Sequence, residues 1–200
     1  LIRNVDEFIL FDDAQYTKHD WRNRNRVKTP QGVQWLTIPV EAKGSLARTI
    51  RETRVTDPSW AARHFKTLRQ NYQQAACYPR YEPLQERLYL DCREDHLSRI
   101  NRRFLETICR ELGCDTQFSW SMDYQVGEDK TARLVSLCQQ AGADEYLSGP
   151  AARDYLDEAQ FAASGIRVLW RDYNGYPEYP QVHPPFAHAV TILDLLLNVG

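Results

Sequence analysis

The chain has 200 residues, which is enough for one domain with a substantial core, with or without a small addition. Its formal net charge of -2 excludes a general polyanion-binding surface, so no nucleic-acid partner is expected and any basic site is local. Five cysteines without a Cys-x-x-Cys pair argue against a disulfide framework or a zinc cluster. Because no signal peptide and no run long enough to cross a membrane is visible, we expect a cytoplasmic protein.

Four strands are predicted in the first half of the chain, at 5–11, 24–28, 33–40 and 48–55. The second and third flank Thr29-Pro30-Gln31-Gly32, which is typical of a hairpin turn. Only residues 41–47 separate the third strand from the fourth, and a parallel crossover needs about a dozen residues or more. The third and fourth strands are therefore expected to be antiparallel.

Three helices follow these strands. The first is predicted to begin at Asp57-Pro58-Ser59, which supplies a capping residue and an early proline, and to end at Pro79. The second is predicted at 84–92. The third, at 96–112, has the clearest pattern, because apolar residues recur at helical spacing and Gly113 stands where a helix C-cap belongs.

Strands and helices alternate in the rest of the chain. Strands are predicted at 116–122, 146–148 and 166–170, helices at 130–141, 154–163 and 191–198, and a long loop at 172–186. This alternation indicates βαβ units. The predicted fold is a single α/β domain over residues 1–200, with three layers, a mixed and mostly parallel sheet, helices on both faces and a Rossmann-like arrangement.

The stretch from Phe11 to Lys28 is the strongest candidate for a ligand site. An apolar strand ends there in two carboxylates, and Arg then alternates with Asn. Because every second side chain of an extended backbone shares a face, the arginines can project together, and forked guanidiniums suit a phosphate or carboxylate. The alternative is a solvated hairpin edge whose charges discourage aggregation. The candidates here are Asp13 and His19 as catalytic bases, and Gln15, Lys18, Trp21, Asn23, Arg24, Asn25 and Arg26 as substrate-binding residues.

The carboxylate pair Asp12-Asp13 also suits a divalent cation such as Mg²⁺. Adjacent strand residues point to opposite faces, however, so the two side chains cannot easily share one ion. A general base is a comparable alternative for this pair. No metal site is predicted, and the sequence indicates no particular cofactor.

Three further segments supply candidate residues. Ser148 and Gly149 lie where a strand meets a helix start that includes Tyr155, and free backbone N–H groups at such a turn attract anions. The alternative is a plain strand-to-helix connection. Lys130 and Thr131 open another helix and could meet a phosphate, or simply form a solvated first turn. His183 and His188 flank two prolines, and either could carry a proton or have only a structural role.

Taken together, several blocks resemble the signature of the WbqC-like protein family, in the family's order and over nearly the whole chain. They are Phe-Asp-Asp-Ala-Gln-Tyr-Thr-Lys at 11–18, Trp-Arg-Asn-Arg-Asn-Arg at 21–26, Lys-Thr-Ala-Arg-Leu at 130–134, the segment 146–156, Asp172-Tyr173, Tyr179-Pro180-Gln181 and Thr-Ile-Leu-Asp-Leu-Leu at 191–196. Members typically begin with a strand and a Gln-Pro-x-x-x-Pro-x-x-Gly-Tyr motif upstream of the residue that is Leu1 here. The resemblance therefore implies that this chain lacks its first strand.

The resemblance also implies a place in bacterial gene clusters for O-antigen and other surface polysaccharides, with a suggested glycine (aminoacyl) transfer. The leading hypothesis is a transferase that modifies a sugar or sugar-nucleotide, with His183 as a further catalytic candidate and His188 as a substrate-binding candidate. The alternatives are a nucleotidyltransferase-like or ATP-dependent activating enzyme, and a non-catalytic binding protein of the same pathway. A small sugar or nucleotide ligand is expected, and the oligomeric state is not indicated. We expect Asp13, Arg24, Arg26, Ser148 and His183 to surround one cleft.

Overall fold

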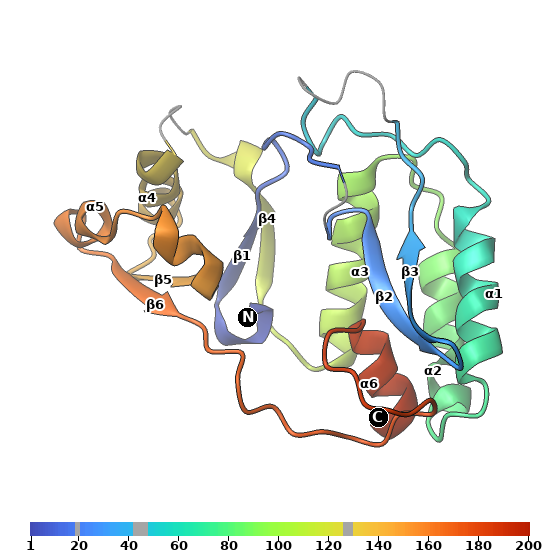
Figure 1. Cartoon of the computed structure of the whole chain (residues 1–200). Coiled ribbons are helices and arrows are strands. Elements are labelled where there is room, and N and C mark those ends of the chain that lie inside the picture. Colours follow the sequence, from blue (N-terminus) through green and yellow to red (C-terminus); the bar gives the residue numbers. More distant parts are fainter. Residues whose placement is uncertain (19–20, 42–47, 126–129) are drawn as a thin grey trace. The chain divides into compact units, whose positions relative to one another are not determined.

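The computed structural model describes residues 1–18, 21–41, 48–125 and 130–200, with the backbone alone at residue 130. The chain divides into two compact units (Figure 1). Unit 1 comprises Leu1–Asp13 and Ile108–Tyr176, and unit 2 comprises Ala14–Thr107 and Pro177–Gly200. The single domain predicted for residues 1–200 stays a prediction.

Unit 1 contains two parallel pairs of short strands. Strand β1 (Glu7–Leu10) pairs with β4 (Gln117–Trp120), and β5 (Glu145–Ser148) pairs with β6 (Arg167–Trp170). The helices are α4 (Lys130–Gln140) and α5 (Glu158–Ala163), with 3-10 turns at Ile2–Asn4, Ser121–Asp123 and Pro150–Asp154. Helix α5 begins later than predicted, because Pro150 starts a separate turn and the Asp157 side chain caps the helix by accepting from the Ala159 N–H.

The core of unit 1 lies between α4, α5 and the β5–β6 pair. Its buried members are Val135, Cys138, Ala152, Leu156, Phe161 and Ile166. Tyr146 stacks on the fully buried Phe161, with the ring centroids 5.0 Å apart. This small core therefore fixes where the ends of β5 and β6 lie within unit 1.

Unit 2 is built on the predicted hairpin. Strands β2 (Arg24–Thr29) and β3 (Gly32–Thr37) are antiparallel, and Gly32 takes a φ of 105° at the turn, a conformation that favours glycine. The helices are α1 (Trp60–Tyr72), α2 (Tyr78–Gln85), α3 (Leu97–Glu111) and α6 (Ile192–Val199), with a π-helical turn at Glu86–Leu90. The last turn of α3 is counted with unit 1.

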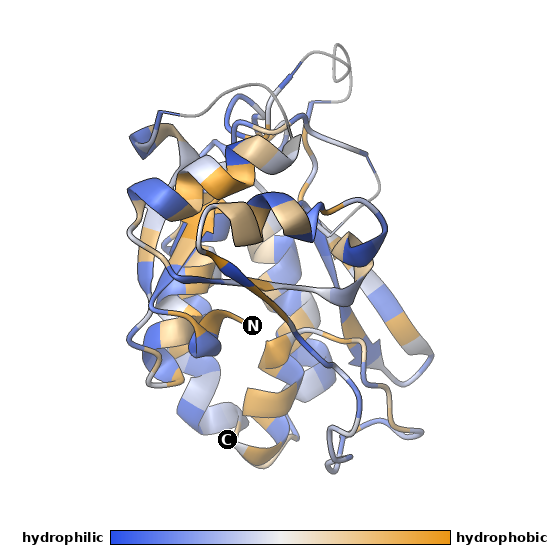
Figure 2. Ribbon diagram, turned by 90° about the vertical axis from the view of Figure 1, so that its left-hand side faces the viewer, coloured by the Kyte–Doolittle hydropathy of each residue, from blue (hydrophilic) through white to orange (hydrophobic). Residues whose placement is uncertain are grey.

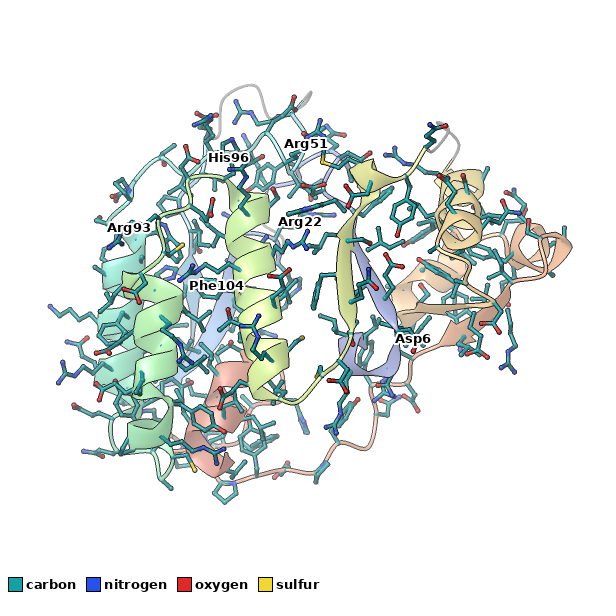
Figure 3. The ribbon with its side chains drawn as sticks, turned by 180° about the vertical axis from the view of Figure 1, so that it is seen from behind. Asp6, Arg22, Arg51, Arg93, His96 and Phe104 are labelled. Carbon is teal, nitrogen blue, oxygen red and sulfur yellow. The ribbon has the colours of Figure 1, made fainter. Side chains whose placement is uncertain are left out.

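Helices α1, α2 and α3 lie on one side of the hairpin in both Figure 1 and Figure 3, and α6 lies beside its turn end (Figure 1). An aromatic cluster joins α1, α3 and the π-helical turn. Phe104 of α3, labelled in Figure 3, meets Tyr89 edge-to-face at 5.0 Å and lies 6.3 Å from Trp60 of α1, measured between ring centroids. Helix α6 is hydrophobic along most of its length (Figure 2), and Leu193, Leu196 and Leu197 are buried.

Two further details of the predicted elements are wrong. Residues 48–55 do not form a strand. The side chain of Glu52 instead bonds the backbone and hydroxyl of Thr49, and this local turn competes with strand pairing. The isolated Val40–Val55 bridge is antiparallel, which is the direction predicted for these two segments. Pro79 does not end the first helix but stands at the start of α2, where its missing N–H is not needed.

The described strands thus give a mixed α/β structure with parallel and antiparallel pairs. They form three two-stranded sheets, and a continuous three-layer sheet of Rossmann type stays a prediction.

Candidate functional site

Four side chains of unit 2 form an Arg–Trp surface, defined as Trp21, Arg24, Arg26 and Trp35. The guanidinium carbon of Arg24 lies 4.1 Å from the centre of the Trp35 ring. The guanidinium carbon of Arg26 lies 5.0 Å from the Trp21 ring and 5.4 Å from the Trp35 ring. The two indoles are themselves 4.9 Å apart, with their planes tilted by 55°. Two cations and two aromatic faces are therefore stacked in one group.

The hairpin creates this surface through its register. Arg24 and Arg26 share a face because they are two residues apart in β2, and Arg26 is directly opposite Trp35 in β3. Trp21 and Trp35 keep 57% and 42% of their surface exposed. Solvent-exposed indole faces beside guanidiniums are a suitable surface for a flat ring or sugar that carries an anionic group.

Arg26 has no carboxylate partner among the described residues. Its Nε atom is buried and makes no hydrogen bond within that part of the chain. Its guanidinium carbon lies over both indoles, and its terminal nitrogens are the atoms that an anion could meet. Sequence reasoning predicted both arginines and Trp21 but missed Trp35, although its place opposite Arg26 follows from the hairpin register.

The other site residues predicted between Phe11 and Lys28 do not belong to the Arg–Trp surface. The Asn23 side chain is buried, and its Nδ2 donates to the Ile38 carbonyl oxygen, which closes the end of the hairpin. Asn25 is exposed, and its Oδ1 accepts from the Arg26 backbone N–H. Gln15 and Lys18 are exposed, and Gln15 forms an isolated bridge with Thr49. His19 lies outside the described residues.

A buried hydrogen-bond network, missed by the sequence analysis, lies beneath the hairpin. The fully buried Asp194 carboxylate accepts from the Tyr72 hydroxyl at 2.7 Å, the Tyr179 hydroxyl at 2.8 Å and the Gln181 amide at 2.9 Å. Burial, followed by the neighbouring carboxylate, raises the pKa of Tyr72, and burial raises the pKa of Tyr179 to about 12. Both phenols therefore remain protonated donors at neutral pH. Asp194 and Gln181 lie in two of the blocks that carry the family resemblance.

This network ties the C-terminal segment to β2. The Tyr72 hydroxyl accepts from the Lys28 backbone N–H at 2.8 Å, and the Thr191 N–H donates to the Arg26 carbonyl oxygen at 2.8 Å. Lys28 is 98% buried, and its ammonium donates to the Pro185 carbonyl oxygen. The network therefore holds the backbone from which Arg24 and Arg26 project.

The two predicted histidines of the long loop differ in exposure. His183 is half-buried and its Nε2 lies 2.8 Å from the Asn71 carbonyl oxygen. Because a carbonyl only accepts, this contact requires the proton on Nε2 and leaves Nδ1 as the nitrogen that can accept a proton. His188 is exposed and its ring meets Phe186 edge-to-face at 4.5 Å.

Asp13 lies in unit 1, just beyond the carboxyl end of β1. Its Oδ1 accepts from the Ser121 hydroxyl at 2.6 Å, and its Oδ2 forms an ion pair with Arg133 of α4, each side chain being 22% exposed. The Arg133 guanidinium also lies 4.7 Å from the centre of the Phe11 ring. Each carboxylate oxygen thus has one partner, and the pairing with Arg133 favours the ionised form of Asp13.

The other predicted residues of unit 1 lie at the ends of β5 and α4. The Ser148 carbonyl oxygen accepts from the Arg171 N–H at 2.8 Å, and a side chain added at Gly149 would meet the Tyr173 hydroxyl at 3.7 Å. Thr131 is buried in the first turn of α4, and the Lys130 side chain lies outside the described part of the chain. Tyr155 is 69% exposed.

A depression of about 550 Å³ in unit 1 is lined by α5 and β6. Its charged lining residues are Glu158 and Arg167, and none of the predicted site residues lines it. Within the described residues, no group of three or more His, Cys, Asp or Glu is placed to hold a metal ion.

The predicted residues thus fall into both units. Arg24, Arg26 and His183 belong to unit 2, and Asp13 and Ser148 belong to unit 1. A single cleft that contains all five stays a prediction.

Fold and site together define a mixed α/β protein that carries a stacked Arg–Trp surface. None of its described helices has the length and hydrophobicity needed to cross a membrane. The chain belongs to the WbqC-like protein family, whose model matches residues 1–200, and the resemblance found in its sequence blocks is thereby confirmed. It is 50% identical over 200 residues to "Uncharacterized protein Rv1507c" of Mycobacterium tuberculosis (strain ATCC 25618 / H37Rv), a match that covers 100% of this chain and 87% of that protein. No solved structure matches the chain.

Proposed function

We propose that this protein is a transferase that binds a phosphate-bearing sugar or sugar-nucleotide on the Arg–Trp surface and transfers an acyl or aminoacyl group to it. The proposal includes the role in bacterial surface polysaccharide (O-antigen) synthesis and the cytoplasmic location expected from the sequence. The three-layer Rossmann-like arrangement predicted for the whole domain also belongs to this proposal.

One observation carries the proposal: two guanidiniums stack on two exposed indoles. A solvated hairpin edge needs charge, but it does not need planar cations held against aromatic rings. Arg binds phosphate oxygens through a planar fork, while indole faces pack against the apolar faces of sugars or the rings of bases. The combination fits a ligand with a ring at one end and phosphate at the other.

The proposed reaction is an ordinary acyl transfer. An amine or hydroxyl of the sugar attacks the carbonyl carbon of an activated acyl donor, such as an ester or thioester. The new C–N or C–O bond forms as the donor's leaving group departs with the electron pair of the broken bond. The proton lost by the acceptor passes to a general base and then to the leaving group.

His183 is the described residue best suited to that base. Its Nε2 is held by the Asn71 carbonyl oxygen, so the ring is oriented and Nδ1 can accept a proton. Asp13, whose two oxygens are engaged by Ser121 and Arg133, is the second candidate. His19 remains a third candidate from the sequence.

The first test is the affinity of the purified protein for UDP-glucose and ATP, measured by calorimetry. The Arg26→Lys variant keeps the charge but loses the planar fork, so UDP-glucose should bind about 10- to 100-fold more weakly, as expected for about 1.5–3 kcal/mol from one charge-assisted hydrogen bond. The matched control is Arg69→Lys, since Arg69 is an exposed arginine of α1 that pairs with Glu82 and is not one of the four residues of the Arg–Trp surface. This control should bind like the wild type.

Three other outcomes would lead to different conclusions. Equal affinity of Arg26→Lys and the wild type would remove the Arg–Trp surface as the binding site. Binding of ATP but not of UDP-glucose would favour the nucleotidyltransferase-like or ATP-dependent alternative. Binding of UDP-glucose without any transfer from acyl or aminoacyl donors would favour the non-catalytic alternative.

A further inference from the structure

Two cysteines meet at the C-terminal end of α3. The Cys114 N–H donates to the Cys109 carbonyl oxygen at 2.8 Å, and the Gly113 N–H donates to the Arg110 carbonyl oxygen at 3.1 Å. Gly113 takes a φ of 64°. These two hydrogen bonds and the left-handed glycine define a Schellman motif, which turns the chain back onto the helix that it leaves. The side chains at the two ends of the motif commonly touch, and here both are cysteines.

The backbone of this motif brings the two cysteines within the range of a disulfide. The Cys109 carbonyl oxygen is about 2.4 Å from its own Cα, and the Cys114 nitrogen is about 1.5 Å from its own Cα. Since a hydrogen bond of 2.8 Å joins these two atoms, the Cα atoms are at most about 6.7 Å apart. Disulfides usually join Cα atoms that are about 4.4–6.8 Å apart. The backbone therefore already has a suitable separation.

The two thiols differ in exposure. Both are free, and Cys109 is buried whereas Cys114 is half-buried. Burial, followed by the neighbouring Cys114 thiol, raises the pKa of Cys109. The thiolate is the reactive form of a cysteine. Cys114 is therefore the thiol that meets a reagent from solvent, and Cys109 is the thiol placed beside it.

Helix α4 ends in the same motif but without a second thiol. The Ala143 N–H donates to the Cys138 carbonyl oxygen at 2.8 Å, the Gly142 N–H donates to the Gln139 carbonyl oxygen at 3.1 Å, and Gly142 takes a φ of 68°. The residue that corresponds to Cys114 is Ala143, which packs against the core that contains Cys138. An apolar contact is thus enough to end a helix in this way, and the cysteine pair of α3 is not required by the motif.

We infer that Cys109 and Cys114 form a thiol–disulfide exchange site, which reacts with low-molecular-weight disulfides and closes into a reversible intramolecular disulfide. The closed form joins the last turn of α3 to the segment that leads into β4. This is also the part of the chain where unit 2 gives way to unit 1. The inference does not depend on the proposed transferase function.

The reaction consists of two exchanges. The Cys114 thiolate attacks one sulfur of an external disulfide such as oxidised glutathione, which forms a mixed disulfide and releases one glutathione thiolate. The Cys109 thiolate then attacks the Cys114 sulfur and releases the second glutathione thiolate. The two protein thiols are oxidised, their protons pass to water or to the released thiolates, and one disulfide is reduced to two thiols. Excess reduced glutathione reverses both exchanges.

The test equilibrates the purified protein with mixtures of oxidised and reduced glutathione, quenches with acid and maps the cysteines by mass spectrometry. Cys109 and Cys114 should become linked to each other. Cys77 and Cys92, which are half-buried but belong to unit 2, are the matched controls and should form no intramolecular link. An unlinked Cys109–Cys114 pair at every glutathione ratio, or a link from either residue to Cys138, would overturn the inference.

The same titration in urea separates the effect of the fold from mere closeness in sequence. If the folded motif positions the pair, its effective concentration should be at least about tenfold higher in the folded protein than in the unfolded chain, since a fold that favours a disulfide is stabilised by it. Equal values in the folded and unfolded protein would overturn the inference.

Single substitutions test the order of the two exchanges. The Cys109→Ser variant should accumulate the mixed disulfide between Cys114 and glutathione, because the second thiol is missing. The Cys114→Ser variant should leave the buried Cys109 reduced under the same conditions. A Cys109→Ser variant that gains no glutathione at Cys114 would contradict the assignment of Cys114 as the attacking thiol.

Discussion

The carboxylate of Asp194 shows how much a single residue contributes to unit 2. It lies fully buried in α6 and accepts from side chains of α1 and of the 177–190 segment, so it connects parts that are distant in sequence. A buried carboxylate is tolerated only when such donors satisfy it. The Tyr72 hydroxyl, which accepts from the Lys28 backbone N–H, extends the connection to β2.

Replacing Asp194 with Asn should therefore destabilise the fold. The amide keeps one acceptor oxygen, but its NH₂ group faces the hydroxyl donors that the lost oxygen satisfied. Leaving buried donors without an acceptor costs about 1–3 kcal/mol, to be measured by denaturant unfolding. Asp154→Asn, an exposed position, is the matched control and should change stability by less than about 0.5 kcal/mol. An Asp194→Asn variant as stable as the wild type would show that the network does not hold unit 2 together.

His64 makes the stability of the protein depend on pH. Its Nε2 donates to the Thr37 carbonyl oxygen at 3.1 Å, and it lies in the aromatic cluster with Trp60 and Tyr89. Burial lowers the pKa of His64 from 6.5 to about 4. The unfolded chain therefore binds a proton between pH 6.5 and 4 that the folded protein does not bind. The contribution of the neutral His64 to the free energy of unfolding is therefore fully present above pH 6.5 and is lost as the pH falls toward 4.

The expected loss over this window is up to about 3 kcal/mol, because one pKa unit corresponds to about 1.4 kcal/mol. It is measured as the free energy of unfolding at a series of pH values. His64→Gln should show a flatter dependence than the wild type, whereas the exposed His188→Gln should keep the wild-type dependence. All three proteins carry the same carboxylates, so the comparison isolates His64. Identical pH profiles for His64→Gln and the wild type would contradict the assignment.

At the scale of elements, the sequence predicts well where a local pattern decides the structure. The hairpin follows from Thr29-Pro30-Gln31-Gly32, and α3 follows from its apolar stripe and Gly113. The prediction fails where short-range polar contacts compete with a strand, as in the bonds between Thr49 and Glu52. The pattern also misplaces Pro79, since a proline that stops one helix can equally begin the next.

In the candidate site, too, the residues set by a local pattern can be predicted from the sequence, and those set by tertiary contacts cannot. Arg24, Arg26 and Trp21 were identified because alternation in a strand is visible in sequence. Trp35 could have been found from the hairpin register, since a residue opposite Arg26 shares its face. The sequence marks Asp194 only as a polar residue in an otherwise apolar helix, Ile-Leu-Asp-Leu-Leu-Leu. Its partners Tyr72 and Tyr179 cannot be predicted from this pattern, because only tertiary folding brings them to it.

At the scale of the whole molecule, the division into two units raises the question of whether they unfold together. Each unit has a fully buried residue in its own core: Phe161 in unit 1 and Leu68 in unit 2. Truncating such residues to Ala costs about 3–5 kcal/mol for Phe and about 2–5 kcal/mol for Leu, through lost burial and the cavity left behind. If the two cores are strongly coupled, a truncation in one unit should destabilise both units; if they are not, it should destabilise only its own unit.

If the units open separately, each truncation should affect only its own unit. Phe161→Ala should lower hydrogen-exchange protection in α4 and leave α1 unchanged, and Leu68→Ala should lower it in α1 and leave α4 unchanged. Each variant serves as the control for the other. Equal losses in both helices for both variants would instead mean one cooperative unit, as predicted from the sequence for residues 1–200. The measurement thus decides between one domain and two, because segments that unfold together in one cooperative transition form one folding domain.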